Sequence, residues 1–349
     1  MIIYSQIYNA VLLDKMKIKL YFGQEDVIKK SGIGRAFVHQ KKALELSGIP
    51  YTTDKDDLDY DILHINTVWP DSFKMINQAR KYNKKIVYRA HSTEEDFKNS
   101  FMFSNTVSGV YKKWLISMYT KGDYIVTPTP YSKRILESYG ITLPIKAVSN
   151  GVDLTQFNPG QEQIESFIQQ YKIDSKDVVI ISVGWLFERK GFDTFVSVAK
   201  KLPEYKFMWF GDIKLSRPTK KIKDLLDDLP QNAILPGYVS GDIIKGAYGR
   251  SNIFFFPSRE ETEGIVVLEA LASKCNVLLR DIPVFSDWLE NGVNCYKGNH
   301  TDDFVEIIKK MINGEYPSLV EQGYKVAEER ELSKIGKELL EVYEETLNL

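Results

Sequence analysis

The chain has 349 residues, which is too long for one typical domain and suits two. With 43% hydrophobic and 27% charged residues it can build a full core, and no run approaches the roughly 18 apolar residues that span a bilayer. The net charge of −1 conceals an imbalance: residues 1–150 carry 22 Lys and Arg against 15 Asp and Glu, and the remainder 24 against 32. A basic half suits anionic lipid, phosphate or nucleic acid, and an unevenly charged solvated surface is the alternative.

The compartment is indicated by the cysteine count and by the first residues. Cys275 and Cys295 are the only cysteines, which predicts small buried side chains in a reducing cytoplasm rather than a disulfide framework. The opening stretch MIIYSQIYNAVLL lacks the basic start and the small-residue cleavage site of a secretory signal. We therefore expect a cytoplasmic protein.

Short β-type runs alternate with helical segments along almost the whole chain. In the first half we expect strands at 17–22, 61–67, 85–90 and 124–129 and a helix over 35–46. In the second half we expect strands at 178–184, 206–211, 233–238, 252–258 and 276–281, and a charged helical segment over about 316–346. The strand runs are nearly continuous in apolar residues, which is typical of strands covered on both faces. The pattern predicts an α/β protein with two doubly wound parallel sheets, joined near residues 150–160.

Ligands of doubly wound folds bind beyond the carboxyl ends of the strands, so we expect the functional residues there. In SGIGRAF (31–37), Gly32 and Gly34 open a helix whose N-terminus favours an anion. A dinucleotide fingerprint would need a third glycine where Phe37 stands, so the loop fits contact with a sugar or phosphate, or a plain helix entry. His91, in RAHSTEED (89–96), follows the third strand and is either a site residue or a hydrogen-bonded structural histidine.

The segment SVGWLFERKG (182–191) follows the first strand of the second half. Arg189 and Lys190 abut Gly191 just before a helix. A fixed pair of cations at a helix start suits a diphosphate, with lysine as a point charge and arginine as a fork. A solvated basic turn is the alternative.

The segment REETEGIVVLEALA (259–272) carries a carboxylate, Glu269, in an otherwise apolar helix. Burying it unpaired would cost several kcal/mol. Backbone N–H groups at Gly264, Ile265 and Val266 are expected to be free for phosphate at the first helical turn. Because a carboxylate can accept both hydroxyls of a ribose diol, we expect a ligand rather than a protein group to satisfy Glu269.

The sequence shows no convincing metal motif. Asp54-Lys55-Asp56 formally matches the Asp-x-Asp pattern of metal-dependent sugar transferases, but it stands in a loop before a strand. No Ser-His-Asp elbow, Cys-x-x-Cys or Walker loop is present. We therefore expect no metal and no other cofactor.

Glu261 and Glu269 are separated by seven residues and resemble the E-x7-E motif of retaining GT-B glycosyltransferases of family 4. The resemblance extends to SNGVDLTQF (149–157), SVGWLFERKG, FFFPSREETEGIVVLEALA (254–272) and LENGVNCY (289–296). It implies two Rossmann-like domains facing across a cleft. Residues 1–155 would form the acceptor- and membrane-facing domain, 156–325 the nucleotide-sugar domain, and 326–349 a helix packing back toward the first.

The resemblance also implies roles for single residues. Glu269 would bind the ribose and Glu261 would lie by the donor sugar, with amides of Gly264, Ile265 and Val266 near sugar and phosphate. Lys190 would neutralise the diphosphate, and His91 would stand on the acceptor side of the anomeric centre. Gly32, Gly34 and Gly184 would line the nucleotide-sugar site. The family's reaction is metal-independent and retains anomeric configuration.

The sequence departs from the family pattern at two places. Many members carry arginine where Trp185 stands, so Arg189 is a candidate for the second catalytic cation. The usual Gly-Phe-Gly is Thr262-Glu263-Gly264, a variant that resembles bacterial diacylglycerol glycosyltransferases adding a second hexose. Glu263 is thus a clue to substrate choice, whereas Glu260 is expected to be peripheral.

The segment VYKKWLISMYTKGD (110–123) mixes lysines with aromatic and aliphatic residues. Such a mix suits an interfacial helix on anionic lipid, and the membrane or acceptor contacts are assigned to Tyr111, Lys112, Lys113, Trp114 and Arg35. Arg35 belongs to a second basic cluster with Lys29, Lys30, Lys41 and Lys42. A core-packed helix with solvated lysines is the alternative. The domain is not basic enough, and has no recognisable module, for nucleic acid.

Together these features predict a cytoplasmic, peripheral enzyme on the inner face of the cell membrane. It would transfer glucose or galactose from UDP-glucose or UDP-galactose to glucosyl-diacylglycerol, giving a diglycosyl lipid. One alternative is a family-4 enzyme acting on a soluble or polymer acceptor, such as a capsule or teichoic-acid precursor. The other is a catalytically silent GT-B subunit, which should have lost Glu261, Glu269 and Lys190.

Overall fold

The computed structural model describes residues 16–28, 31–100, 103–212 and 219–349. The opening stretch of 13 residues, on which the expectation of a cytoplasmic protein partly depends, lies outside these ranges. So do Lys29 and Lys30 of the second basic cluster. The chain divides into two compact units. Unit 1 comprises the described residues up to Thr93, with Gly109–Gly151 and Arg330–Leu349, and unit 2 comprises Glu94–Ser108 and Val152–Glu329.

Unit 1 contains a six-stranded parallel sheet in the order β2-β1-β3-β4-β5-β6. Its strands are β1 Ile18–Tyr21, β2 Tyr51–Thr52, β3 Ile62–Ile65, β4 Lys85–Arg89, β5 Tyr124–Thr127 and β6 Ile145–Ala147. Its helices are α2 Glu25–Ile28, α3 Gly32–Leu46, α4 Ser72–Lys81, α7 Pro130–Ser138 and α16 Leu332–Leu347, together with most of α6 Ser104–Tyr119. The register is parallel throughout, with Ile18 opposite Ile62 and Tyr21 opposite Ile65.

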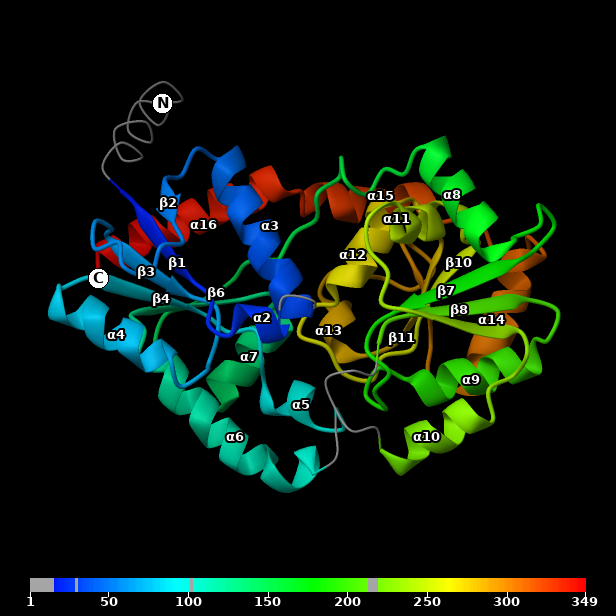
Figure 1. Ribbon diagram of the computed structural model, residues 1–349, viewed down its shortest axis with the longest axis horizontal. Coiled ribbons are helices and arrows are strands. Elements are labelled where there is room, and N and C mark those ends of the chain that lie inside the picture. The colour runs from blue at the N-terminus through cyan, green and yellow to red at the C-terminus, as the bar shows by residue number, and fades with distance from the viewer. Residues whose placement is uncertain (1–15, 29–30, 101–102, 213–218) are drawn as a thin grey trace. The chain divides into compact units, whose positions relative to one another are not determined.

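Both faces of this sheet are covered, which explains its continuous apolar strands. Alternate residues such as Leu20 and Val87 pack against α3 and α16. Their neighbours, such as Tyr21 and Tyr88, pack against α4, α6 and α7. Helices α3 and α16 lie side by side on one face (Figure 1).

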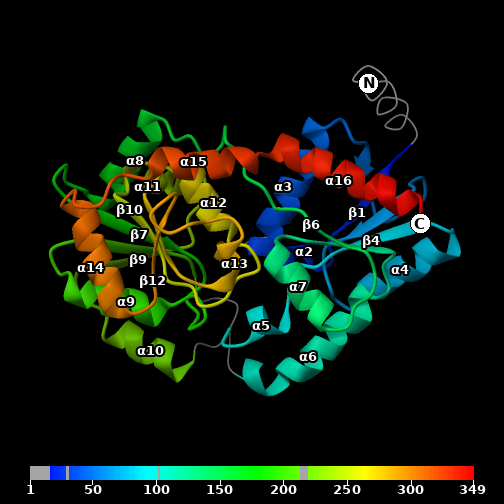
Figure 2. The same cartoon turned by 180° about the vertical axis from the view of Figure 1, so that it is seen from behind.

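Unit 2 contains a second six-stranded parallel sheet, in the order β12-β11-β10-β7-β8-β9. Its strands are β7 Val179–Val183, β8 Lys206–Phe210, β9 Ala233–Gly237, β10 Ile253–Phe256, β11 Val277–Arg280 and β12 Tyr296–Gly298. Its helices are α5 Glu94–Phe97, α8 Gln161–Tyr171, α9 Phe192–Lys201, α10 Lys220–Asp227, α11 Asp242–Arg250, α12 Ile265–Ala272, α13 Pro283–Ser286, α14 Thr301–Ile312 and α15 Val320–Glu329. Helices α9, α10 and α14 share a core on one face (Figure 2).

The predicted fold class is confirmed, because each unit is a doubly wound, Rossmann-like α/β layer. All nine strands predicted from the sequence are present. Three more, β2, β6 and β12, are edge strands of the two sheets. The predicted helical segment 316–346 is divided at Arg330–Glu331 into α15 and α16. Both cysteines are buried free thiols, and burial raises the pKa of each to about 12. No helix among the described residues is both long and apolar enough to span a bilayer.

Candidate functional site

The predicted glycine loop of unit 1 forms the first turn of α3. Ser31 caps this helix, its Oγ accepting a hydrogen bond from the backbone N–H of Gly34 at 3.3 Å. A Cβ at Gly32 would meet no atom within 4 Å, so this glycine borders open space. The turn therefore has the helix entry and the open approach that the sequence predicts. The nucleotide-sugar role of Gly32 and Gly34 stays a prediction.

His91 follows β4 and is buried in unit 1 with 7% exposure. Its Nε2 lies 3.3 Å from Oδ1 of Asn66, which follows β3. Burial, and then the nearby Arg89 guanidinium, hold the pKa of His91 well below its usual range. The ring is therefore neutral near pH 7, and its Nε2 is engaged by the side chain of Asn66. Sequence reasoning missed Asn66, although its position after a neighbouring strand was a usable signal.

In unit 2, the loops that follow β7 and β10 are held in contact at Gly191. This glycine has a φ of +78°, and a Cβ there would lie 2.2 Å from the carbonyl oxygen of Pro257. Only glycine allows both the backbone conformation and the approach. The contact brings Lys190, on one loop, next to the residues that follow Pro257 on the other.

Lys190, which is partly buried, and Glu261, which is buried, form an ion pair at this contact. Nζ of Lys190 lies 2.5 Å from Oε1 of Glu261, which also accepts a 2.7 Å hydrogen bond from Oγ of Ser258. Burial acts to raise the pKa of Glu261, but Lys190 and Arg189 outweigh it and the net direction is down. Burial lowers the pKa of Lys190 despite its carboxylate partner. Two predicted catalytic residues are thus brought together.

Arg189 is 8% exposed, and its guanidinium has protein partners. Nη1 lies 2.7 Å from Oδ1 of Asp96 and 4.0 Å from Oε2 of Glu261. Nε donates to Oγ of Ser100 at 2.9 Å, and Nη1 donates to the carbonyl oxygen of Glu260 at 2.7 Å. Arg189 therefore anchors the 94–100 segment to the rest of unit 2, a function that the sequence did not reveal. Its predicted catalytic role stays a prediction.

Burial raises the pKa of Asp96 above its ordinary value, even though Arg189 and Lys190 act to lower it. The carboxyl group thus belongs to the same electrostatic cluster as the Lys190–Glu261 pair. The run of acids in RAHSTEED was a signal for this residue, but nothing in the sequence indicated that it pairs with Arg189.

The turn before α12 has the predicted form. Gly264 is the N-cap residue and has a left-handed backbone with φ of +90°. Among the described residues, the backbone N–H groups of Ile265 and Val266 have no hydrogen-bond acceptor. First-turn N–H groups of this kind form an anion site. Gly184 directly follows β7, and a Cβ at this position would lie 3.8 Å from Cδ of Lys190.

Glu269 is 2% exposed and does have a protein partner. The hydroxyl of Tyr248, on α11, donates to Oε2 of Glu269 at 2.9 Å. The expectation that no protein group satisfies this carboxylate is therefore wrong. Tyr248 stands 21 residues earlier on another helix, and the sequence offered no signal for the pair. Ribose binding by Glu269 stays a prediction.

The predicted membrane helix packs largely on unit 1. The indole N–H of Trp114 donates to the carbonyl oxygen of Val68 at 2.8 Å, and Tyr111 is partly buried in the same core. Nζ of Lys112 lies 4.1 Å from the centroid of the Tyr139 ring, and Lys113 is exposed. These contacts match the alternative of a core-packed helix with solvated lysines.

The assigned membrane roles of these four residues and of Arg35, half-buried in the first turn of α3, stay predictions. Over the described ranges, no group of three or more His, Cys, Asp or Glu side chains is arranged to hold a metal ion.

Comparisons with known families place most of the chain within glycosyltransferases. Residues 163–329 match the family described as glycosyl transferases group 1. Residues 49–156 match glycosyltransferase family 4. The two matches fall in the two halves that carry the motifs above.

Two curated relatives act on lipids by name. The chain is 42% identical to the processive diacylglycerol alpha-glucosyltransferase of Acholeplasma laidlawii, over 96% of this chain and 99% of the relative. It is 22% identical to the alpha-galactosylglucosyldiacylglycerol synthase of Streptococcus pneumoniae, over 85% and 82%.

Solved structures share the fold at lower identity. Anabaena HepE in complex with UDP-glucose matches with a TM-score of 0.75 and 16% identity, over 95% of this chain and all of that one. Sucrose-phosphate synthase from Thermosynechococcus elongatus matches with a TM-score of 0.74 and 12% identity, over 96% and 100%. These neighbours have the GT-B fold, so the architecture of this chain is GT-B.

Proposed function

The chain belongs to glycosyltransferase family 4, and we propose that it is a retaining hexosyltransferase that extends a membrane glycolipid. It moves glucose or galactose from a UDP-sugar to monoglucosyl-diacylglycerol and forms a diglycosyl-diacylglycerol. The observation that carries the proposal is the 42% identity, over nearly the whole chain, to a relative named for diacylglycerol glucosyl transfer. The buried charge cluster of unit 2 supplies the chemistry.

The donor is held by the residues that follow β7 and β10 and by α12. Lys190 exchanges part of its contact with Glu261 for the diphosphate, whose negative charge it offsets. The first-turn N–H groups of Ile265 and Val266 donate to phosphate or sugar oxygens. Glu269, oriented by the Tyr248 hydroxyl, accepts from the ribose diol.

In the reaction, the bond between C1 of the hexose and the diphosphate oxygen breaks. A bond from the acceptor hydroxyl oxygen to C1 forms on the same face, and the hydroxyl proton passes to the departing diphosphate. Stabilisation of the charge that develops on the leaving group is the main catalytic contribution, and Lys190 is its source. Neutral His91 stands on the acceptor side and adds no charge there.

Metal independence is part of the proposal, because a lysine and helix N–H groups supply the positive charge that the leaving diphosphate needs. Activity is therefore expected to persist in EDTA. If EDTA abolishes transfer and added Mg²⁺ or Mn²⁺ restores it, this part is wrong.

The enzyme works as a peripheral protein on the inner face of the membrane, where UDP-sugars and the glycolipid meet. Its affinity for the surface comes from basic side chains such as Lys112 and Lys113, so it should fall with salt. Co-sedimentation with anionic vesicles at low salt tests this. Failure to bind them would favour a soluble or polymer acceptor.

The deciding experiment offers UDP-glucose and UDP-galactose separately, over vesicles of diacylglycerol or of glucosyl-diacylglycerol, and identifies lipid products by mass. We expect one donor to give a diglycosyl lipid whose new linkage keeps the donor's anomeric configuration. Glu261→Gln and His91→Ala should lower activity on every acceptor. Unchanged activity in both variants would contradict the site assignment, and absence of any glycolipid product would contradict the function.

A further inference from the structure

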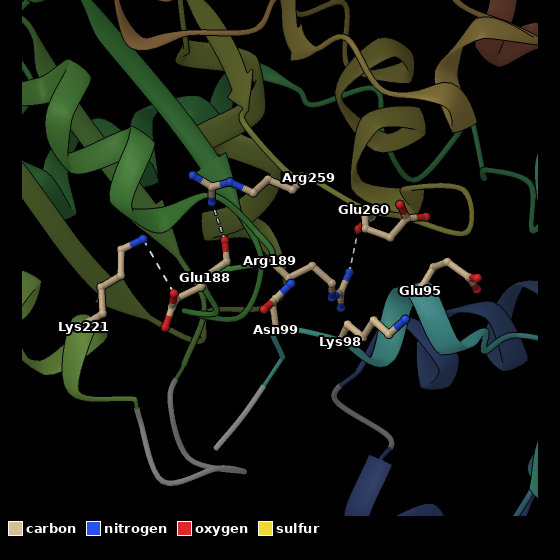
Figure 3. A pocket seen from close by; sticks show the side chains of 8 residues that line it. All are labelled: Glu95, Lys98, Asn99, Glu188, Arg189, Lys221, Arg259 and Glu260. Atoms are coloured by element: carbon tan, nitrogen blue, oxygen red, sulfur yellow. Dashed lines mark hydrogen bonds and ion pairs between the residues drawn. The ribbon is translucent and has the colours of Figure 1, made fainter. Parts of the chain in front are cut away.

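Unit 2 contains a pocket of about 470 Å³ to which the proposed reaction assigns no ligand. Figure 3 shows its lining side chains, which come from α5 and the residues after it, from α10, and from the loops that follow β7 and β10. They are Glu95, Lys98, Asn99, Glu188, Arg189, Lys221, Arg259 and Glu260. All eight are polar, so the pocket suits a hydrophilic ligand.

One wall of this pocket is built by the 94–100 segment, and Arg189 fixes it in place. The guanidinium binds Asp96 and Oγ of Ser100, and that hydroxyl in turn donates to the carbonyl oxygen of Asp96 at 3.0 Å. The same guanidinium binds the backbone of Glu260 on the opposite wall. A nearly buried arginine therefore ties two walls together, and the pocket is a preorganised feature of unit 2.

The cations that line the pocket are paired with carboxylates of the protein. Nζ of Lys98 lies 3.0 Å from Oε1 of Glu94. Lys221 and Arg259 both bind Asp193, at 2.6 and 2.8 Å. A pocket whose cations already have carboxylate partners offers little net attraction for phosphate. It suits a neutral ligand with many hydroxyl groups, because carboxylates accept from hydroxyls and ammonium or guanidinium groups donate to them.

We infer that this pocket binds the neutral sugar head group of the acceptor glycolipid. The inference rests on the proposed function, which supplies the glycolipid. Glu260 lines the pocket and directly precedes Glu261, so a head group held there lies beside the residues assigned to the donor sugar. Glu95 and Glu260 accept hydrogen bonds from its hydroxyls and Lys98 donates to them. Glu260, which the sequence predicts to be peripheral, becomes an acceptor-binding residue.

An apolar stripe starts four residues after Asn99. It consists of Phe103, Val107 and Val110, which are 72%, 43% and 72% exposed. Val107 and Val110 lie three residues apart on α6, so they share one side of that helix, and Phe103 directly precedes its first residue. Exposed apolar side chains that follow a pocket-lining segment in the sequence match a ligand with a sugar head and acyl chains, so the stripe takes the acyl region of the same glycolipid. A free sugar would use the pocket alone.

The test compares Glu95→Gln and Lys98→Met with two matched variants, Glu204→Gln and Lys200→Met, which lie at another charged pocket of unit 2. Acceptor KM, donor KM and kcat are measured with glucosyl-diacylglycerol vesicles. The pocket variants should raise the acceptor KM about tenfold and leave the donor KM within about twofold, since each loses a charge-assisted hydrogen bond. The matched variants should behave as the unchanged protein.

Two further measurements separate the sources of affinity. Phe103→Ser should raise the KM for vesicles and leave the KM for water-soluble glucosylglycerol unchanged. Inorganic phosphate should not compete with glucosylglycerol, whereas competition would assign the pocket to an anion and overturn the inference. If the unchanged protein transfers sugar to the glycolipid but the pocket variants keep its acceptor KM, the inference fails alone. If the unchanged protein shows no transfer to the glycolipid, the proposed function fails and the inference with it.

Discussion

The two units differ in the partners of their inner lysine and arginine side chains. In unit 1 the buried cations Lys19 and Arg89 donate to neutral oxygens, namely the carbonyls of Lys55 and Asp57 and those of Val148 and Ser149. In unit 2 the cations Lys190 and Arg189 bind carboxylates. The difference matches the proposed function, in which unit 2 binds the charged donor.

The ion pair of unit 2 should give the largest effect. Lys190→Met leaves Glu261 buried without its partner and should lower activity by about 10²–10³-fold. It should also lower the free energy of unfolding by about 3–5 kcal/mol. Kinetics and urea unfolding measure the two effects.

The double variant Lys190→Met/Glu261→Gln is the control for the stability part. It removes both charges, so its loss of stability should be smaller than the sum of the single losses. Additive losses would show that the two side chains do not interact in unit 2.

The Arg189 anchor should give the next largest effect. Asp96→Asn keeps the shape of the side chain and removes its charge. The local free energy of opening should fall by about 1–3 kcal/mol, so the backbone amides of residues 96–100 should show faster hydrogen exchange. Asp302→Asn is the matched control, because Asp302 pairs with Lys201 in an exposed position. Equal exchange in the two variants would contradict the anchor.

The neutral histidines of unit 1 predict a pH dependence of stability. Burial and Arg89 hold the pKa values of His64 and His91 well below the ordinary 6.5. As pH falls below that value, these histidines take up protons in the unfolded chain but stay neutral in the folded chain. The free energy of unfolding therefore decreases. The slope is at most about 1.4 kcal/mol per pH unit for each histidine.

His64→Gln should reduce that slope, and the comparison of slopes is independent of any change in stability at neutral pH. Urea unfolding between pH 7 and pH 5 measures it. An unchanged slope would mean that the ring of His64 is charged in the folded protein.

The smallest effect is expected at the Tyr248 hydroxyl. Tyr248→Phe removes one hydrogen bond to Glu269 and should cost about 1 kcal/mol of binding free energy for the nucleotide. The KM for the UDP-sugar should rise about fivefold with little change in kcat. A fall in kcat alone would indicate that Glu269 acts on the reacting sugar rather than on the ribose.

The sequence allowed the prediction of the fold because long apolar strands recur between helices, and of the charged loops because they follow strand ends. The missed strands β2, β6 and β12 have only two or three residues each, too few to show a period. Ser258 and Gly191 lie inside the recognised motifs, whereas Tyr248 and Asp96 contact the site from distant parts of the chain. Such contacts depend on tertiary packing, which a local pattern does not encode.

The proposed donor site depends most on one assignment: Lys190 binds the diphosphate and Glu269 binds the ribose. Isothermal titration of UDP and of uridine measures it directly. Lys190→Met should weaken UDP binding at least tenfold and leave uridine binding unchanged, while Glu269→Gln should weaken both to a similar extent. A Lys190→Met protein that binds UDP as tightly as the unchanged protein would contradict the account.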